Sequence, residues 1–179
     1  EIASCLVGSE MCIRDSFYNA LIHDERLLRV MQEKGYRGKF FLHTHHKVQL
    51  KDFTGNDIIE VMQQGIDYQE EFRNNALLVT DFSSVAFDFA YLKKPVIYAQ
   101  FDKDTFFQGQ VYSEGYFDYE RDGLGPVCYD YESTIEALIH AIENDCVLDP
   151  LYDERGNAFY RWFDQDNCKR VYDEIRRLH

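Results

Sequence analysis

The feature that most constrains the fold is a series of continuous apolar runs that alternate with amphipathic stretches. The runs FFL, LLVT and PVIYA occupy residues 40–42, 77–80 and 95–99, and the amphipathic stretch SSVAFDFAYL lies between the last two. Runs that are apolar at every position predict strands buried on both faces, because a half-exposed strand alternates apolar and polar residues. Such strands, separated by helices at short spacing, are typical of an α/β fold with a parallel sheet covered on both faces.

The expected elements follow from this pattern and from the residues that interrupt it. Strands are predicted at residues 39–44, 57–62, 76–81 and 94–100. Helices are predicted at residues 17–33, 67–74, 83–92 and 131–145, with two more after residue 151. The long segment between the fourth strand and the fourth helix has little periodicity, but its many aromatic residues favour order.

Composition and charge exclude several classes of protein. The 179 residues suffice for one domain with a core, and 45% of them are hydrophobic, which excludes a disordered chain. The sequence contains no run of about 18 apolar residues, so it predicts no membrane-spanning helix. The formal net charge of −13 argues against a nucleic-acid partner but does not exclude a small anionic ligand. The five cysteines form no CxxC pair, which favours unpaired thiols in a reducing, cytosolic setting.

The first 16 residues, EIASCLVGSEMCIRDS, differ from the rest of the chain. They show neither a helical nor a strand period, and the string resembles translated adaptor sequence of the kind that contaminates environmental reads. We therefore expect residues 1–16 to be a non-native or disordered segment outside the fold. The alternative is a frayed native segment.

Small polar residues follow the apolar run LLVT at the point where the chain turns into the next helix. Asp81 ends the run, and Ser83 and Ser84 follow it. Ligands of doubly wound sheets lie beyond the carboxyl ends of the strands, where a helix start offers unpaired N–H groups to an anion. The serines therefore predict a phosphate cradle, or alternatively an ordinary N-cap formed by Asp81 or Ser83. Asp88, one turn further on, belongs either to a solvated helix face or to a site for ribose hydroxyls.

Three histidines, His43, His45 and His46, end the predicted strand FFLHTHH at the same edge of the sheet. A histidine in this position is suited to act as a general base or to bring positive charge to a phosphate. Two alternatives stay open, a zinc site on His43 and His45 and an ordinary polar strand end.

Taken together, the motifs DFSSVAFDF, KKP and GYFDYE resemble the CDP-glycerol glycerophosphotransferase family, the polymerases and primases of teichoic acid synthesis. The resemblance covers about residues 38–175, including the stretches GYFDYERDGLGPVCYDYESTIEALIHAIEN and NCKRVYDEI. It implies a GT-B architecture of two Rossmann-like domains, of which this chain is similar to the C-terminal, nucleotide-binding half. Residues 17–179 would then be a CDP-glycerol-binding Rossmann-like domain of an enzyme about twice as long.

The resemblance also implies a reaction and a set of site residues. A hydroxyl of a polyol-phosphate polymer or lipid-linked acceptor attacks the β-phosphorus of CDP-glycerol, and CMP leaves. The family histidine falls on His43, with His45 as the alternative if the alignment shifts by two residues. The substrate-binding residues that the resemblance implies are Asp81, Ser83, Ser84 and Val85 at the pyrophosphate and Asp88 at the ribose.

No metal and no cofactor are expected, and the implied partners are the CDP-glycerol donor, the acceptor and a missing N-terminal domain. The expected location of the whole enzyme is cytoplasmic, peripheral on the inner face of the plasma membrane. Two other functions are open to the same fold, a nucleotide-sugar-dependent GT-B glycosyltransferase half and a non-catalytic nucleotide-binding module.

Overall fold

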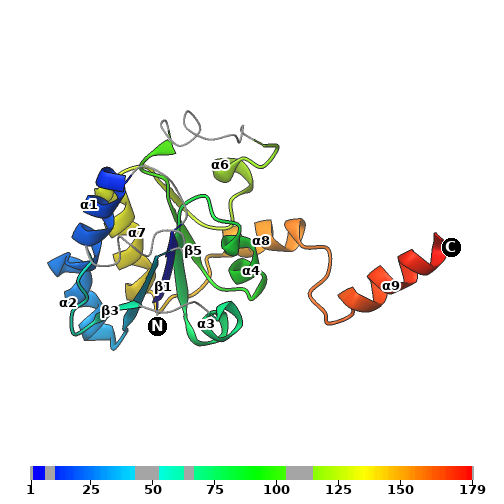
Figure 1. The fold of residues 1–179 in the computed structure, drawn as a ribbon, viewed down its shortest axis with the longest axis horizontal. Coiled ribbons are helices and arrows are strands. Elements are labelled where there is room, and N and C mark those ends of the chain that lie inside the picture. The colour runs from blue at the N-terminus through cyan, green and yellow to red at the C-terminus, as the bar shows by residue number, and fades with distance from the viewer. Residues whose placement is uncertain (1, 7–10, 43–52, 63–66, 104–114, 179) are drawn as a thin grey trace.

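The computed structural model describes residues 2–6, 11–42, 53–62, 67–103 and 115–178. Its strands form one sheet in the order β3-β2-β1-β4-β5-β6, and every neighbouring pair is parallel (Figure 1). The strands are β1 (Ile2–Leu6), β2 (Gly38–Leu42), β3 (Ile59–Met62), β4 (Leu77–Thr80), β5 (Val96–Ala99) and β6 (Val127–Cys128). The predicted α/β class with a parallel sheet is confirmed.

Helices cover both faces of this sheet, as predicted. The helices are α1 (Met11–Ile22), α2 (Glu25–Lys34), α3 (Tyr68–Asn74), α4 (Val85–Tyr91), α6 (Tyr119–Asp122), α7 (Tyr131–Glu143), α8 (Pro150–Phe159) and α9 (Asn167–Arg177). One apolar cluster joins α1, α2 and α7 to the sheet, and a second joins α4 to the opposite face. Within β4, Leu77 and Val79 belong to the first cluster and Leu78 to the second, which explains why this strand is apolar at every position.

The single helix predicted for residues 17–33 is wrong, because the structure divides it into α1 and α2. Asp24 lies between them in an extended conformation, and its side chain accepts hydrogen bonds from the backbone N–H groups of Arg26 and Leu27. This carboxylate satisfies donors that a new helix leaves unpaired, so the chain restarts there instead of continuing. Tyr131 of α7 donates a hydrogen bond of 2.9 Å to the same carboxylate, which ties the break to the neighbouring helix.

The beginning of the chain also differs from the expectation that residues 1–16 lie outside the fold. Residues 2–6 form β1, which occupies the middle of the sheet and pairs with both β2 and β4. A short strand without helical or strand periodicity can take this place because a central strand is held by two ladders of backbone hydrogen bonds, which do not depend on side chains. The expectation that residues 1–16 are non-native stays a prediction.

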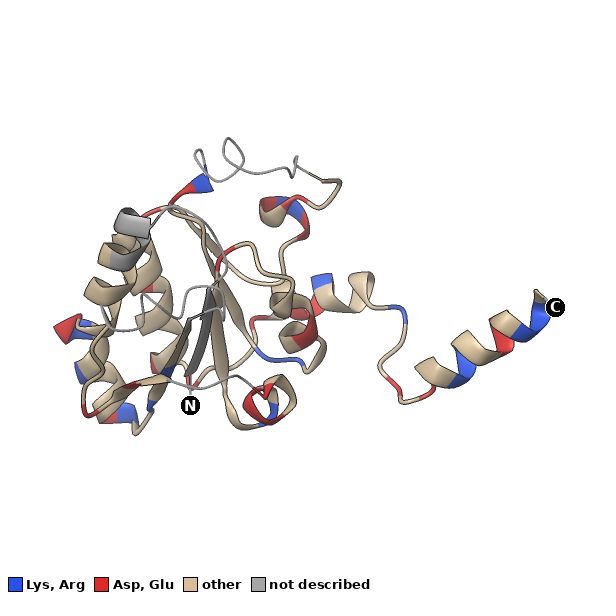
Figure 2. Cartoon of the chain, viewed as in Figure 1, with Lys and Arg blue, Asp and Glu red and all other residues tan. Residues whose placement is uncertain are grey.

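The last helix, α9, extends away from the body of the molecule (Figure 1). None of its residues is buried, and Val171, Ile175 and Leu178 make an exposed apolar stripe at helical spacing. The charged residues of α9 include both signs, as the colours of its ribbon show (Figure 2). Across the described ranges, no helix combines the length and the apolar character that crossing a membrane requires.

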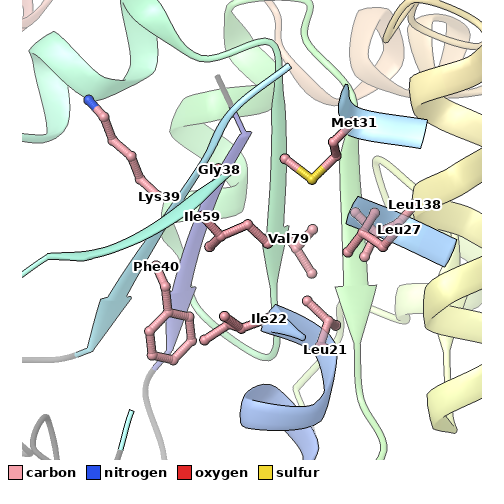
Figure 3. Close-up of a pocket in the computed structure, with 10 residues that line it drawn as sticks. All are labelled: Leu21, Ile22, Leu27, Met31, Gly38, Lys39, Phe40, Ile59, Val79 and Leu138. Carbon is pink, nitrogen blue, oxygen red and sulfur yellow. The ribbon is translucent and has the colours of Figure 1, made fainter. Parts of the chain in front are cut away.

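A small apolar cavity of about 30 Å³ lies in the core between the sheet and the helices α1, α2 and α7 (Figure 3). It is too small for a nucleotide, and almost all of its lining is hydrophobic, so we interpret it as a packing gap and not as a ligand site. Its lining residues are Leu21, Ile22, Leu27, Met31, Gly38, Lys39, Phe40, Ile59, Val79 and Leu138.

The KKP segment, which follows α4, has a structural role at the start of β4. The ammonium group of Lys94 donates hydrogen bonds to the carbonyl oxygens of Phe72, Arg73 and Asn75 at 2.7, 2.9 and 2.7 Å. These carbonyls end α3 and would otherwise lack partners. Burial lowers the pKa of Lys94, so this position has a desolvation cost that the three hydrogen bonds offset.

We predict that Lys94→Met lowers the free energy of unfolding by about 2 kcal/mol, because three carbonyls lose a charged donor. Urea denaturation measures this loss. Lys93→Met is the matched control: Lys93 pairs with Asp153 at 2.7 Å on the surface, and its loss should cost less than about 1 kcal/mol. Equal losses in the two variants would contradict the role assigned to Lys94.

Candidate functional site

The order of the strands identifies one place in the sheet as the expected ligand site. From β1 the chain adds β2 and β3 on one side, and β4, β5 and β6 follow on the other. The order in which strands are added to the sheet therefore reverses between β1 and β4. Open α/β sheets bind ligands at such a switch point, outside the carboxyl ends of the strands. The segment that leaves the carboxyl end of β4 begins with Asp81 and contains Ser83 and Ser84.

The two serines and Asp81 lie together at this junction with different degrees of exposure. Asp81 is 1% exposed, Ser83 is half-buried and Ser84 is exposed. The hydroxyl of Ser83 accepts a long hydrogen bond, 3.5 Å, from the backbone N–H of Val85. Ser84 occupies the N-cap position of α4, but its side chain makes no capping hydrogen bond.

This absent cap distinguishes α4 from most helices of the described chain. Aspartate side chains cap α2, α3, α6, α7 and α8 by accepting backbone N–H hydrogen bonds. The capping aspartates are Asp24, Asp67, Asp118, Asp130 and Asp149. At α4 the side chain of Ser84 is exposed and makes no capping hydrogen bond. The N-cap alternative named Ser83, whose hydroxyl accepts the long hydrogen bond from Val85, and it remains an alternative for that serine.

Asp88 and Ser84 share one exposed face of α4. They are four residues apart, and residues at this spacing are neighbours on a helix surface. Both are exposed, whereas Ala86 and Phe89 are buried and anchor the helix to the sheet; Val85 is half-buried. A carboxylate one turn from a hydroxyl is suited to accept hydrogen bonds from ligand hydroxyls and would repel a phosphate placed against it.

The structure shows what the second tyrosine of the GYFDYE segment, Tyr119, contacts. The hydroxyl of Tyr119 donates a hydrogen bond of 3.4 Å to the carbonyl oxygen of Phe82. Its ring lies edge-on to Phe82 and Tyr98, with centroid distances of 5.9 and 5.0 Å. Burial, and then the charge of Asp81, raise the pKa of Tyr119 to about 12, so its hydroxyl is a neutral donor near pH 7.

Two glycines allow the following DGLGP segment to lie against its neighbours. A Cβ atom at Gly123 would lie 2.0 Å from the carbonyl oxygen of Tyr119, and one at Gly125 would lie 1.8 Å from that of Val96. Both distances are far shorter than any van der Waals contact. The short elements α6 and β6, which sequence periodicity did not predict, therefore depend on residues without side chains, and they hold Tyr119 on the β4–α4 junction.

We predict that Gly125→Ala lowers the free energy of unfolding by about 3 kcal/mol or more, because the added methyl group meets the backbone of β5 and not a movable side chain. Gly156→Ala is the control: nothing lies within 4 Å of a Cβ at this position in α8, so alanine should raise stability by about 0.5–1 kcal/mol. Thermal or urea denaturation measures both. A neutral Gly125→Ala would contradict the close approach.

The predicted catalytic residues His43 and His45 lie outside the described residues, as does His46. Within the ranges that the structure describes, no group of three His, Cys, Asp or Glu side chains is placed to hold a metal ion. The cysteines Cys128, Cys146 and Cys168 are free thiols, the first two of them buried.

The fold and the junction define a Rossmann-like α/β domain with a candidate ligand site at the switch point of its sheet. Residues 8–177 match the family profile described as CDP-Glycerol:Poly(glycerophosphate) glycerophosphotransferase, and the chain belongs to this family. Its curated relatives include the minor teichoic acid biosynthesis protein GgaB of Bacillus subtilis (strain 168), 37% identical over 91% of this chain and 18% of that protein. Another is the teichoic acid glycerol-phosphate transferase of Staphylococcus aureus, 29% identical over 84% of this chain and 37% of that protein.

Solved structures of the wall teichoic acid polymerase TagF share the fold. One aligns with 98% of this chain and 43% of its own, with a TM-score of 0.61 and 21% sequence identity. Another, of a histidine variant soaked with CDPG, aligns with a TM-score of 0.57 at 20% identity. The polymerase is a GT-B-like enzyme, in agreement with the predicted fold class. The chain spans less than half the length of these relatives.

Proposed function

We propose that this chain is the donor-binding half of an enzyme that transfers glycerol phosphate from CDP-glycerol to a hydroxyl of a teichoic-acid-type acceptor. The acceptor oxygen forms a bond to the β-phosphorus, the bond from this phosphorus to the oxygen of CMP breaks, and the proton of the acceptor passes to a base. The observation that carries the proposal is Ser84, which begins α4 at the switch point of the sheet with an exposed side chain that makes no capping hydrogen bond, in a chain of this family.

The roles proposed for the junction follow from charge and exposure. Ser83 and Ser84 donate hydroxyl hydrogen bonds to the pyrophosphate, which accepts hydrogen bonds but has none to give. Val85 contributes its backbone N–H beside them. Asp81 is buried, so we assign it to the positioning of the turn and not to a direct phosphate contact. Asp88, exposed one turn further along α4, accepts hydrogen bonds from the ribose hydroxyls.

For the chemical step we propose His43 as the residue that stabilises charge on the departing CMP, with His45 as the alternative if the alignment shifts by two residues. Both follow a strand whose carboxyl end lies at the same edge as that of β4, since all strands of the sheet are parallel. The base that takes the acceptor proton then belongs to the other half of the enzyme, across the interdomain cleft of a GT-B architecture.

We predict that Ser84→Ala weakens CDP-glycerol binding by about 1 kcal/mol if the hydroxyl is an ordinary donor, and by up to about 3 kcal/mol if it bonds a charged phosphate oxygen. The melting temperature should stay unchanged, because the Ser84 side chain caps nothing. Isothermal titration calorimetry and a thermal melt measure the two quantities on the same preparation.

Ser133→Ala is the matched control for this experiment. Ser133 belongs to the capping box of α7, where its hydroxyl accepts from the backbone N–H of Asp130. Its loss should lower stability by about 0.5–2 kcal/mol and leave donor binding intact. If Ser84→Ala behaved like Ser133→Ala, with lower stability and full affinity, the serine would be a structural residue and the proposed site would be wrong.

We predict that His43→Ala, made in the complete enzyme, lowers kcat by on the order of a hundredfold or more, since electrostatic stabilisation of a leaving group contributes at this scale. CDP-glycerol affinity should fall much less, because the serines still bind the pyrophosphate. Steady-state kinetics and equilibrium binding separate the two effects. A nearly silent His43→Ala beside an inactive His45→Ala would transfer the role to His45.

Donor preference distinguishes the proposal from the other functions open to this fold. Calorimetry with CDP-glycerol, CDP-ribitol and a UDP-sugar compares the candidate donors on one protein sample. Binding of the UDP-sugar in preference to both CDP-polyols would replace the proposal with a nucleotide-sugar glycosyltransferase half.

A further inference from the structure

Gln100 is a buried polar side chain that the proposed site does not yet use. It directly follows β5 and is 1% exposed. Neither the Nε2 nor the Oε1 atom of its carboxamide has a hydrogen-bond partner in the structure as described. Burying an amide without partners is costly, so a native protein that retains one has a use for it or fills the site with another molecule.

The sheet register places Gln100 level with the serine turn. Thr80 of β4 pairs with Tyr98 of β5, and Gln100 lies two residues beyond Tyr98, beside the segment that leaves β4. The backbone N–H of Gln100 donates to the carbonyl oxygen of Cys128 at 2.8 Å. The ladder to β6 therefore continues through Gln100, and the strand alternation extends to it.

Alternation also decides the face on which the Gln100 side chain lies. Val96 and Tyr98 belong to the apolar cluster on the α4 face, whereas Ala99 belongs to the opposite cluster and Phe101 packs against it. Gln100 shares the parity of Val96 and Tyr98, so its carboxamide lies on the face that carries α4. This is the face on which Tyr119 contacts Tyr98 and the Phe82 carbonyl.

The chemistry of an amide limits what this side chain would bind. Nε2 donates and Oε1 accepts, so a ligand that satisfies both atoms must offer an acceptor and a donor side by side. A phosphate oxygen only accepts and would leave Oε1 unpaired. Two adjacent hydroxyl groups satisfy both atoms at once, because each hydroxyl can donate and accept.

We propose that Gln100 binds a vicinal pair of hydroxyls on the donor and is thereby a specificity-determining residue of this site. The inference rests on the proposed function, since it takes CDP-glycerol as the donor. That donor carries two such pairs, one on the glycerol and one on the ribose, and the experiment below distinguishes them.

The test compares the wild-type chain with Gln100→Met, which keeps the length of the side chain and removes both polar atoms. Affinities for CDP-glycerol, CDP and 2′-deoxy-CDP are measured by calorimetry, together with the melting temperature. CDP-glycerol affinity should fall about tenfold, the loss expected when net hydrogen bonds to a ligand are removed. The melting temperature should stay constant or rise, because two unpaired buried polar atoms are gone. Gln69→Met, at an exposed position of α3, is the control and should change nothing.

The three ligands identify which hydroxyl pair is bound. If it is the glycerol pair, the loss is confined to CDP-glycerol. If it is the ribose pair, CDP and CDP-glycerol lose affinity alike and 2′-deoxy-CDP does not. Gln100→Asn, which keeps the amide but withdraws it by one carbon, should give the same ligand pattern and replaces Gln100→Met if that variant does not fold.

Two results would overturn the inference while leaving the proposed function in place. One is unchanged affinity for all three ligands in Gln100→Met. The other is an equal loss for all three with a lower melting temperature, which would show that Gln100 is a structural residue satisfied by bound water. A wild-type chain that binds none of the three ligands would instead contradict the proposed function itself, and this inference with it.

Discussion

Burial of the central strands on both faces is the constraint on which the rest of the structure depends. Every residue of β4 and β5 is buried, and the side chains of each strand divide between two apolar clusters. Polar groups that must meet a ligand therefore cannot lie within these strands and have to follow them. Because the strands are parallel, the segments after β4 and β5 leave the sheet at the same edge, which brings Ser83, Ser84 and Gln100 to one end of the molecule.

The acidic character of the chain is in part a consequence of helix capping. Five aspartates satisfy the first N–H groups of helices, where a negative charge also interacts favourably with the helix dipole. The lysines of the KKP segment, which would be natural candidates for phosphate contacts, are engaged elsewhere. Lys94 binds the carbonyls that end α3, and Lys93 pairs with Asp153. The candidate site at α4 thus relies on neutral hydroxyls in an acidic protein.

The sequence predicted the elements whose own residues specify them. The strands β4 and β5 and the helix α4 were found within two residues at each end, because continuous apolar runs and an amphipathic stretch mark them. Periodicity could not show the break at Asp24, where a capping carboxylate competes with an unbroken apolar stripe. It also could not show β6, which has two residues, or β1, whose place in the sheet depends on its neighbours. For the candidate site, the sequence proposed the serines and Asp88, which stay predictions. The burial of Asp81 and of the Gln100 amide depends on tertiary packing and could not be read from the sequence.

The GYFDYE motif, which shares in the family resemblance, supports the candidate site and does not itself contain the two serines. Within GYFDYERDGLGP, Tyr119 supports the backbone of Phe82, and Gly123 and Gly125 let the segment approach β5. Burial, and then the charge of Asp81, raise the pKa of Tyr119 to about 12, so its hydroxyl stays protonated and can donate near pH 7. At the start of α4 the Ser84 side chain makes no capping hydrogen bond, and the Ser83 hydroxyl accepts a long one, 3.5 Å, from the Val85 N–H. The aromatic contact and the hydrogen bond from Tyr119 to Phe82 support this turn through its backbone, while the side chain of Ser84 stays exposed.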